Sequence, residues 1–501
     1  MLEDILKDMS KYLPSKIAPA IIGIVTIPII THLFIPEEYG NYALVLATIS
    51  ILAAIVGWLP MSIIRFYPIY EKKSQLKEFY GTTIGLSVLS IGILFFIFTF
   101  ILFFNKTLFS KDLNSLMRIG ILIFVNTAFF QLLQHFLRAK RQVTIYSITE
   151  VWDKIGSICF GLILIFIFKQ DIKGLLWGAF LSGLLILPFL WKICFANISF
   201  QVTNISRDLT WQMMKYGFPL VVGNLAAWIL SLSDRYILDF IRNSREVGIY
   251  SVCYNISEHS IRLLVSLFLI ASGPIGIRIW EHKGKKASQE FVSKLTRFYL
   301  IFCIPAIVGM GVMAKPLIKI LTAQEYNEGY VIVPLVAIGM FFHGLQQRYH
   351  FGLLFYNKTY FIMIGILVSG ILNIGLNLLF VSRYGYLAAA VTTLISYIFL
   401  FILMVIISRR FYVWQFPLKT LRKVIYASLI MGAIVYYIGN NLSPIIAVNL
   451  IVGIFTGLFL YFLALFLFKE FSYEEIQQVK YLKQKFIVKL SLLISTKKIN
   501  M

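Results

Sequence analysis

The chain reads FIPEEYGNY at Phe34–Tyr42 and FIRNSREVGIY at Phe240–Tyr250. Both stretches contain the pattern Glu-x-Gly-x-Tyr, and the second copy starts 208 positions after the first. Taken alone, the pattern is typical of a tight turn, in which glycine supplies a permissive backbone and tyrosine anchors the chain at a membrane interface. Its recurrence raises the question of whether the protein consists of two related halves.

Composition indicates an integral membrane protein. The 501 residues are 59% hydrophobic and only 14% charged, with a mean hydropathy of +0.82. Hydrophobic runs of about twenty residues recur along the whole chain, which predicts transmembrane helices; barrel strands would be shorter and would alternate. Met1–Tyr12 mixes acidic residues with lysines, so we do not expect a cleavable signal peptide.

We predict an all-α membrane protein with about fourteen transmembrane helices. The expected spans are 13–34, 40–64, 80–104, 115–136, 150–168, 174–195, 215–238, 248–273, 292–313, 329–349, 360–381, 384–407, 423–440 and 445–468. They group into an N-terminal six-helix lobe at 1–195, a C-terminal six-helix lobe at 215–407 and an extra helix pair at 423–468. Residues 469–501, which follow the helix pair, form a tail.

The distribution of positive charge predicts orientation. The net charge of +23 does not indicate nucleic-acid binding, because most Lys and Arg residues lie in short loops between apolar runs. They favour one set of loops over the other by roughly three to one, which places both termini in the cytoplasm. The two Glu-x-Gly-x-Tyr copies then lie on the outer side, six spans apart. Since six is even, the lobes are expected to be parallel repeats about an axis normal to the membrane.

Further matches support the duplication. Lys11-Tyr12 precedes the first span and Lys215-Tyr216 precedes the seventh, while Gly174–Ala179 and Gly385–Ala390 open the sixth and twelfth. Spans 1 and 7 both contain proline, and a pair of interrupted helices in two halves points to a binding site at the repeat interface.

Several other features carry less information. The four cysteines (Cys159, Cys194, Cys253 and Cys303) lie in apolar runs and are expected to be buried; we predict no metal site and no cofactor. The tail begins with Ser472-x-x-Glu475, a capping box, and its apolar spacing predicts a basic amphipathic helix on the cytoplasmic leaflet, with a solvated tail as the alternative. Phosphate-loop, zinc and nucleophile motifs are absent from the sequence, so we do not predict an enzyme.

Charged residues inside the spans are the candidate site, because each costs roughly 2.5–3.5 kcal/mol at the centre of a membrane helix. The cationic candidates for substrate binding are Lys16, Arg65, Lys154, Arg235 and Arg262; the candidates for coupling or gating are Asp153, Asp234 and Glu258. One interpretation is a hydrated cavity with cationic walls that suits an anionic substrate. The other is that these residues are interface snorkellers or structural ion pairs, such as Glu258 with Arg262 along one helix face. His259, His343 and His350 are more typical of helix interfaces.

The sequence resembles a known family at several of these positions. KYLPSKIAPAIIGIVTIPIITHLFIPEEYGNYALV, followed by IIRFYPIY, resembles the opening of bacterial polysaccharide flippases, and SDRYILDFI with EVGIYSVCYNI resembles the start of their second half. These proteins belong to the multidrug/oligosaccharidyl-lipid/polysaccharide exporter superfamily. The resemblance covers roughly residues 10–465, and its functional positions here are Arg65, Asp234 and Arg235.

The resemblance implies two lobes around a central cavity and the movement of undecaprenyl-diphosphate-linked oligosaccharide from the inner to the outer leaflet of the bacterial cytoplasmic membrane, for O-antigen or capsule-type polysaccharide. It implies lipid-linked oligosaccharide and membrane lipids as partners, with a polysaccharide polymerase and chain-length machinery alongside. The alternatives are a proton- or sodium-coupled multidrug exporter of the same superfamily, a membrane polysaccharide polymerase or ligase, and an assembly scaffold.

Overall fold

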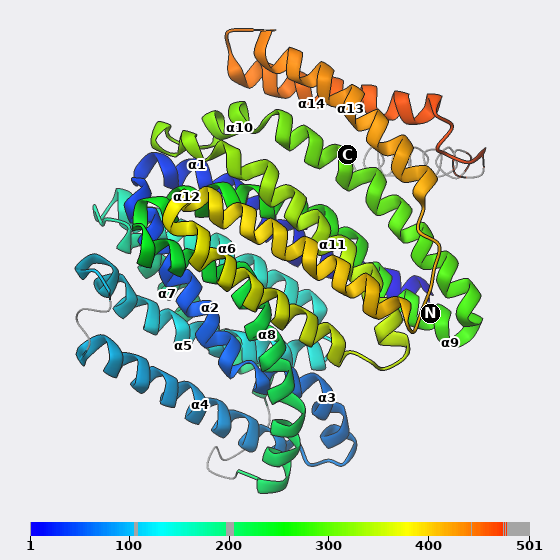
Figure 1. Cartoon of the computed structure of the whole chain (residues 1–501). Helices are drawn as coiled ribbons and strands as arrows, with labels where there is room; N and C mark the ends of the chain where they lie inside the picture. Colours follow the sequence, from blue (N-terminus) through cyan, green and yellow to red (C-terminus); the bar gives the residue numbers. More distant parts are fainter. Residues whose placement is uncertain are drawn as a thin grey trace, which may run out of the picture.

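The protein is built from α-helices. The computed structural model describes residues 2–104, 109–196, 205–441 and 443–473, together with Glu475 and Gln477. These residues form helices and their connections, and none of them forms a β-strand (Figure 1). The predicted all-α fold class is therefore confirmed.

The described helices fall into three groups along the chain. The N-terminal half contains α1 (Leu2–Leu33), α2 (Pro36–Val56), α3 (Trp58–Lys72), α4 (Leu76–Phe104), α5 (Lys111–Ala139), α6 (Val143–Phe166) and α7 (Lys173–Phe195). The C-terminal half contains α8 (Arg207–Ile241), α9 (Ser244–Val312), α10 (Ala314–Leu321), the 3₁₀ helix η1 (Gln324–Val331), α11 (Ile332–Phe355) and α12 (Tyr360–Arg409). The extra pair consists of α13 (Leu418–Asn441) and α14 (Ile446–Leu467).

Each of the fourteen predicted spans falls on helix to within a few residues. Four of them lie in two long helices, since α9 and α12 each contain a break in helical geometry, at Gly284 and Gly385. The predicted span 40–64 is divided into α2 and α3 at Gly57. Ten stretches of the described residues are long and apolar enough to cross a membrane. The chain is therefore a multi-pass membrane protein.

Glycine makes the turn inside α12 possible. Gly385 has φ +56° and ψ −140°, a conformation that residues with a Cβ rarely adopt. Immediately beyond it, the Tyr386 amide donates to Glu246 Oε2 of α9 (2.9 Å), while Glu246 Oε1 accepts from Arg242 Nε (2.8 Å). The glutamate of the second Glu-x-Gly-x-Tyr copy thus caps the second half of α12.

We predict that Gly385→Ala destabilises the protein. The strained backbone costs about 1–3 kcal/mol, and the new Cβ would lie 2.2 Å from Glu246 Oε2, so the capping carboxylate would also be displaced. Thermal unfolding of the purified protein should show a lower melting temperature. Gly375→Ala is the matched control in the same helix, because nothing lies within 4 Å of its added Cβ; equal melting temperatures for the two variants would contradict the prediction.

Most helix contacts lie within one half of the chain, and a few helices connect the two halves. In the N-terminal half, α7 packs on α5 and α6, and α1 packs on α6; in the C-terminal half, α11 packs on α9 and α12, and α12 packs on α8. The halves meet where α9 packs against α1 and α2 and where α8 packs against α2 and α3. The beginning of α8, including Leu209 and Met213, belongs to a hydrophobic cluster formed mainly by N-terminal helices.

The two Glu-x-Gly-x-Tyr copies contact each other at this junction. A Cβ added to Gly40 of α2 would lie 1.9 Å from the Ser244 carbonyl oxygen, and one added to Gly248 of α9 would lie 1.9 Å from the Pro36 carbonyl oxygen. The contact is reciprocal, because Ser244 and Pro36 are themselves 208 positions apart. At the ends of the same helices, Arg245 Nε lies 3.8 Å from Glu37 Oε1. We call this contact the glycine seam.

The prediction of a tight turn at the motif is wrong. Both copies lie in the first turns of helices, and their glycines permit two backbones to approach closely. The second tyrosine, Tyr250, is fully buried, and its hydroxyl donates to Asp234 Oδ2. Within the first copy, Glu38 Oε2 accepts from the Ile35 amide at 3.3 Å. The motif is a packing motif that joins the halves.

The prolines of spans 1 and 7 were expected to interrupt their helices, and they do not. α1 contains Pro14, Pro19 and Pro28 and is nevertheless one helix, and α8 continues through Pro219. The breaks occur instead at glycines, as in α9 and α12. An interrupted pair of spans 1 and 7 therefore gives no indication of a binding site here.

The extra helix pair is tied to α9 at one end. Arg297 donates to Glu470 Oε1 (2.8 Å) and to Glu475, and Lys423 Nζ lies 3.3 Å from Glu470 Oε2. The hydrogen bond from Arg297 lowers the pKa of Glu475 below its ordinary value. Glu475 Oε2 and Ser472 Oγ accept from each other's backbone amides at 2.9 and 3.3 Å, which confirms the predicted capping box. The rest of the predicted tail helix lies outside the described residues.

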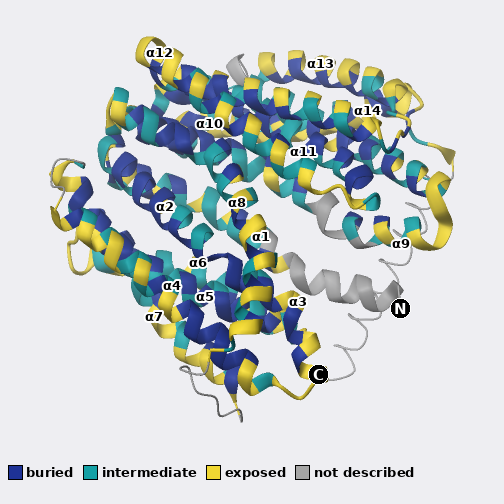
Figure 2. Ribbon diagram, turned by 60° about the horizontal axis from the view of Figure 1, so that its bottom comes forward, coloured by how far each residue is buried: buried dark blue, intermediate teal, exposed yellow. Residues whose placement is uncertain are grey.

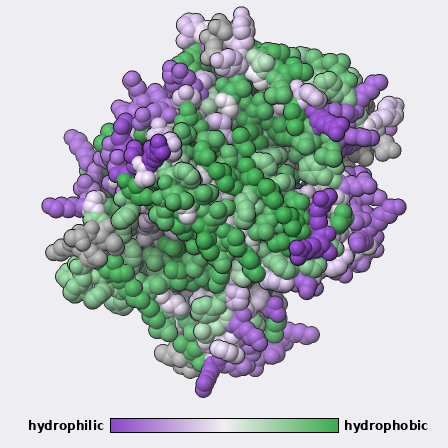
Figure 3. Space-filling view, in the orientation of Figure 1, coloured by the Kyte–Doolittle hydropathy of each residue, from purple (hydrophilic) through white to green (hydrophobic). Residues whose placement is uncertain are grey.

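The surface has the pattern expected of a membrane protein. Exposed residues are frequent along the outward sides of α4, α13 and α14 (Figure 2), and many of them are large and apolar, such as Phe96 and Phe455. On the face seen in Figure 3 the middle is hydrophobic and hydrophilic side chains gather toward the rims. Cys194, Cys253 and Cys303 are buried as predicted, whereas Cys159 is exposed.

Candidate functional site

α6 carries a polar face on the side opposite its exposed apolar side chains. Asp153 and Lys154 form an ion pair (2.9 Å), and the Lys154 side chain is 50% exposed. Successive residues of an α-helix are rotated by about 100° around its axis. On this count, Asp153 and Lys154 are each rotated by more than about 100° from the centre of the exposed apolar stripe. That stripe consists of Ile148, Trp152, Ile155, Ile163 and Phe166. The exposed lysine therefore faces the inside of the bundle.

The first part of α9 carries an exposed cation within the predicted span 248–273. Arg262 donates to Glu258, four residues earlier, which confirms their predicted pairing; the side chains are 66% and 14% exposed. Among the side chains of residues 244–266, Arg245 at the helix start is the only other exposed one. Because α9 packs against α1, α2 and α11, an exposed arginine in this segment faces a solvent-accessible space between helices.

α1 lies between these two helices. It packs against both α6 and α9, and a Cβ on Gly23 would lie 2.8 Å from His259 Nε2 of α9. In the C-terminal half, the helix beside α1 is the first part of α9. Lys16 belongs to α1, and its side chain lies outside the described residues.

Asp234 and Arg235 of α8 form a sealed polar cluster. They are 1% and 3% exposed. Asp234 Oδ1 accepts from the Arg235 amide (2.9 Å) and lies 3.6 Å from Arg235 Nη1. Arg235 also donates to Ser251 Oγ (3.1 Å) and lies 5.0 Å from the centre of the Tyr254 ring. In this conformation neither charged group is accessible to a substrate.

The sealed cluster continues into α12 through residues that our sequence analysis missed. Thr393 Oγ1 donates to Asp234 Oδ2 (3.4 Å) and accepts from Asn373 Nδ2 (3.2 Å). Asn377 donates to Asn373 Oδ1 (3.0 Å) and accepts from Thr392 (2.7 Å). All four are buried. The available signal was the pair of asparagines four residues apart in an apolar span, which places them on one helix face.

Of the other predicted residues, Arg65 lies apart from both groups, whereas His343 is close enough to Arg262 and Glu258 to interact with their charges. Arg65 of α3 is exposed, and its Cζ lies 4.6 Å from the centre of the Tyr216 ring, so it joins α3 to α8. His343 lies against the ring of Tyr397 at 5.1 Å. His350 keeps one buried ring nitrogen without a hydrogen-bond partner. Within the described residues, no group of three or more His, Cys, Asp or Glu side chains is placed to hold a metal ion.

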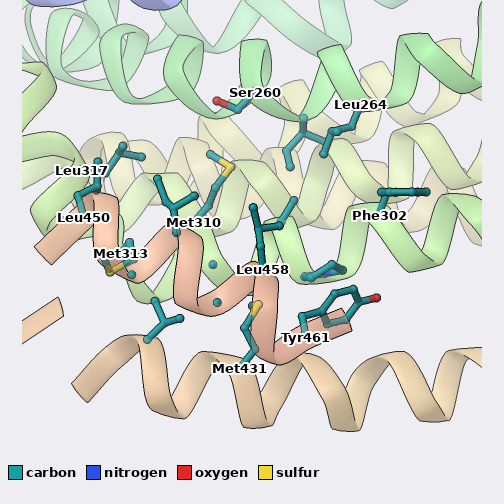
Figure 4. Close-up of a pocket in the computed structure, with 18 of the residues that line it drawn as sticks. Ser260, Leu264, Phe302, Met310, Met313, Leu317, Met431, Leu450, Leu458 and Tyr461 are labelled. Carbon is teal, nitrogen blue, oxygen red and sulfur yellow. The ribbon is translucent and has the colours of Figure 1, made fainter. Parts of the chain in front are cut away.

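An apolar groove runs between the C-terminal half and the extra helix pair (Figure 4). Its volume is about 510 Å³, and it is lined by both parts of α9, by α13 and α14, and by Ile24 of α1. Met310, Met431 and Leu458 are typical of its walls, while Ser260 and Tyr461 supply its only hydroxyl groups. The Tyr461 hydroxyl is already used, since it donates to the Ile301 carbonyl oxygen (2.6 Å). The groove suits a hydrocarbon chain.

The arrangement of helices is shared with solved transporter structures. It is similar to the lipid II flippase MurJ in an inward closed conformation, with a TM-score of 0.77 over 93% of this chain and 99% of that one at 16% identity. An inward-facing multidrug resistance MATE family transporter matches with a TM-score of 0.66 over 80% of this chain and 94% of that one at 12% identity. The chain thus has the fold of the MOP superfamily of transporters.

The family is defined by the sequence. The family model described as polysaccharide biosynthesis protein matches residues 5–280, more than half of the chain, and the chain belongs to this family. An uncharacterised membrane protein of Methanocaldococcus jannaschii is 21% identical over 477 residues, which cover 88% of this chain and 91% of that protein. The resemblance stated from the sequence is confirmed at the level of the family, and the likeness to the solved transporters confirms the fold.

Proposed function

We propose that the protein is a flippase that moves undecaprenyl-diphosphate-linked oligosaccharide from the inner to the outer leaflet of a bacterial cytoplasmic membrane. The observation that carries the proposal is that α9 presents an exposed arginine on one face and lines an apolar groove on another. A lipid-linked sugar diphosphate has both an anionic head and a long hydrocarbon tail. Both termini would lie in the cytoplasm.

In this proposal the head lies among the cations that face the interior. Arg262 and Lys154 lie on helices that both pack against α1, and a guanidinium can bind phosphate oxygens through two hydrogen bonds. Lys16 would join them from α1. The hydrocarbon tail would follow the apolar groove, entering beside Ile24 at the edge between α1 and α9.

The glycine seam would close the outer side while the head enters from the cytoplasm. Parting of the seam would open the outer side, so that the two halves alternate access to the cations. Asp234 is proposed as the coupling residue, because its buried carboxylate is connected through Thr393 to Asn373 and Asn377, and oxygen atoms of these residue types suit a hard cation such as sodium. Asp153 and Glu258 would modulate the two neighbouring cations.

We expect Arg262→Ala to reduce surface polysaccharide by about 10- to 100-fold, because a charged hydrogen bond contributes about 1.5–3 kcal/mol. The membrane level of the protein should stay unchanged, since the side chain is 66% exposed, and lipid-linked units should accumulate on the inner leaflet. The measurement is complementation of a deletion strain, with leaflet-specific labelling of the units.

Arg118→Ala, which removes an exposed arginine from α5, is the matched control and should complement fully. Normal polysaccharide with Arg262→Ala would remove Arg262 from the site. Unpolymerised units in the outer leaflet of the deletion strain would instead indicate a polymerase. A second candidate, an ion-coupled multidrug exporter, is favoured by the likeness to the MATE family transporter; it predicts normal polysaccharide and increased drug sensitivity in the deletion strain.

A further inference from the structure

Besides Arg235, which pairs with Asp234, a second cation is buried in the C-terminal half, and it has no counter-charge among the described residues. Arg348 of α11 is 0% exposed. Its Nε and both Nη atoms have no hydrogen-bond partner, and no carboxylate pairs with it within the part of the chain that the structure describes. The guanidinium lies over the ring of Tyr299 in α9, with Cζ 4.8 Å from the ring centre.

The surroundings hold Arg348 in this position. Tyr299 donates its hydroxyl hydrogen to the Phe341 carbonyl oxygen (2.8 Å), and its ring stacks on the Phe341 ring at 5.6 Å. Phe341 precedes Arg348 by about two turns of α11. The guanidinium is therefore directed toward the middle of the helix and away from its end at Phe355. Arginines near the ends of membrane helices usually extend toward water, and Arg348 does the opposite.

Within the described part of the chain, no acidic side chain neutralises this charge. A buried, unpaired guanidinium costs several kcal/mol, whereas a cation–π contact contributes about 0.5–2 kcal/mol. Among the described residues, the titratable groups that interact with this guanidinium are the phenol of Tyr299, the thiol of Cys303 and the imidazole of His350. Phenols, thiols and imidazoles carry no negative charge near neutral pH at their ordinary pKa values. A bound anion would supply the counter-charge that the described residues lack.

We propose that the Arg348 guanidinium, held in place by the Tyr299 ring, binds a small inorganic anion of the halide class inside the C-terminal half. The guanidinium is fully buried, so a lipid headgroup or a sugar diphosphate does not fit beside it. The anion neutralises the guanidinium and stabilises the packing of α11 on the second part of α9. This role is independent of the proposed flippase activity.

The test uses the purified full-length protein at constant ionic strength, with sodium chloride titrated against sodium gluconate. A ligand that binds only the folded state raises the melting temperature with its concentration. We expect a saturable rise of several degrees in chloride or bromide, its loss in Arg348→Met, and its weaker retention in Arg348→Lys. Arg118→Met, which removes an exposed cation, should respond like the unchanged protein.

A chloride response that is absent from the unchanged protein, or that persists in Arg348→Met, would overturn the proposal. If Arg348→Met fails to fold, crystals of the unchanged protein soaked in bromide decide the matter. An anomalous peak beside the Arg348 guanidinium supports the site, and a position without a peak rejects it. Neither outcome bears on transport, so failure here leaves the flippase proposal intact.

Discussion

Gly248→Leu is expected to reduce transport by about 5- to 150-fold, because closing an overpacked contact costs about 1–3 kcal/mol. The first atom of the new side chain would lie 1.9 Å from the Pro36 carbonyl oxygen. The Pro36 carbonyl oxygen belongs to the backbone, so it cannot rotate away as a flexible side chain would. The two halves must therefore move apart. The protein should then remain open on its outer side.

Two measurements check this expectation. Surface polysaccharide in a complemented deletion strain reports transport, and spin labels at Glu37 and Arg245, which lie on either side of the glycine seam, report its width. We expect the label distance to increase in Gly248→Leu. Gly40→Leu should behave in the same way, since its added Cβ would lie 1.9 Å from the Ser244 carbonyl oxygen.

Gly92→Leu and Gly375→Leu are the matched controls, because nothing lies within 4 Å of a Cβ added at either position. Both should transport normally and show the unchanged label distance. If Gly248→Leu transports at the normal rate with an unchanged distance, the seam is not a moving contact. If the distance grows while transport persists, closure of the seam is not part of the transport cycle.

Arg235→Met is expected to lower the free energy of unfolding by about 3–5 kcal/mol. The substitution leaves Asp234 charged and 1% exposed, with Tyr250 and Thr393 as its remaining side-chain partners. The double variant Asp234→Leu/Arg235→Met removes both charges and should recover part of the loss, because a buried ion pair can often be replaced by apolar side chains at little cost.

Unfolding of the purified variants in denaturant, followed by tryptophan fluorescence, measures both effects. Arg65→Met is the control, because that arginine is exposed and bonds to an aromatic face in place of a carboxylate; its effect should stay near that of a surface substitution. A loss below about 1 kcal/mol for Arg235→Met, or a double variant less stable than the single one, would show that the pair does not act as a unit.

Much of the fold could be predicted from periodicity and composition. A run of about twenty apolar residues can satisfy its backbone hydrogen bonds inside a membrane only as a helix or in a closed barrel, so helices such as α4 and α14 follow from their own residues. The repeat of Glu-x-Gly-x-Tyr predicted two related halves, and their common origin stays a prediction. The ion pair of Glu258 and Arg262 could be predicted because a spacing of four residues places them on one helix face.

The errors arose where a residue's role depends on a distant segment. Gly40 and Gly248 were interpreted as turn residues, since the sequence does not show that another backbone passes within contact distance. Asp234 and Arg235 were treated together with the exposed cations, although partners from α9 and α12 seal them from solvent. Arg348 was not among the predicted site residues, because the sequence does not show that its side chain is buried against Tyr299 of another helix.

The residues of single segments were enough to predict that the protein is helical and crosses the membrane many times, and the repeated motif predicted two related halves. These properties are local, since each helix satisfies its own backbone and the repeat is written in the residues. The tertiary structure alone decided which cations face an open space, which are buried, and that the two copies of the motif contact each other. Exposure and close approach are properties of pairs of segments, and packing brings those pairs together.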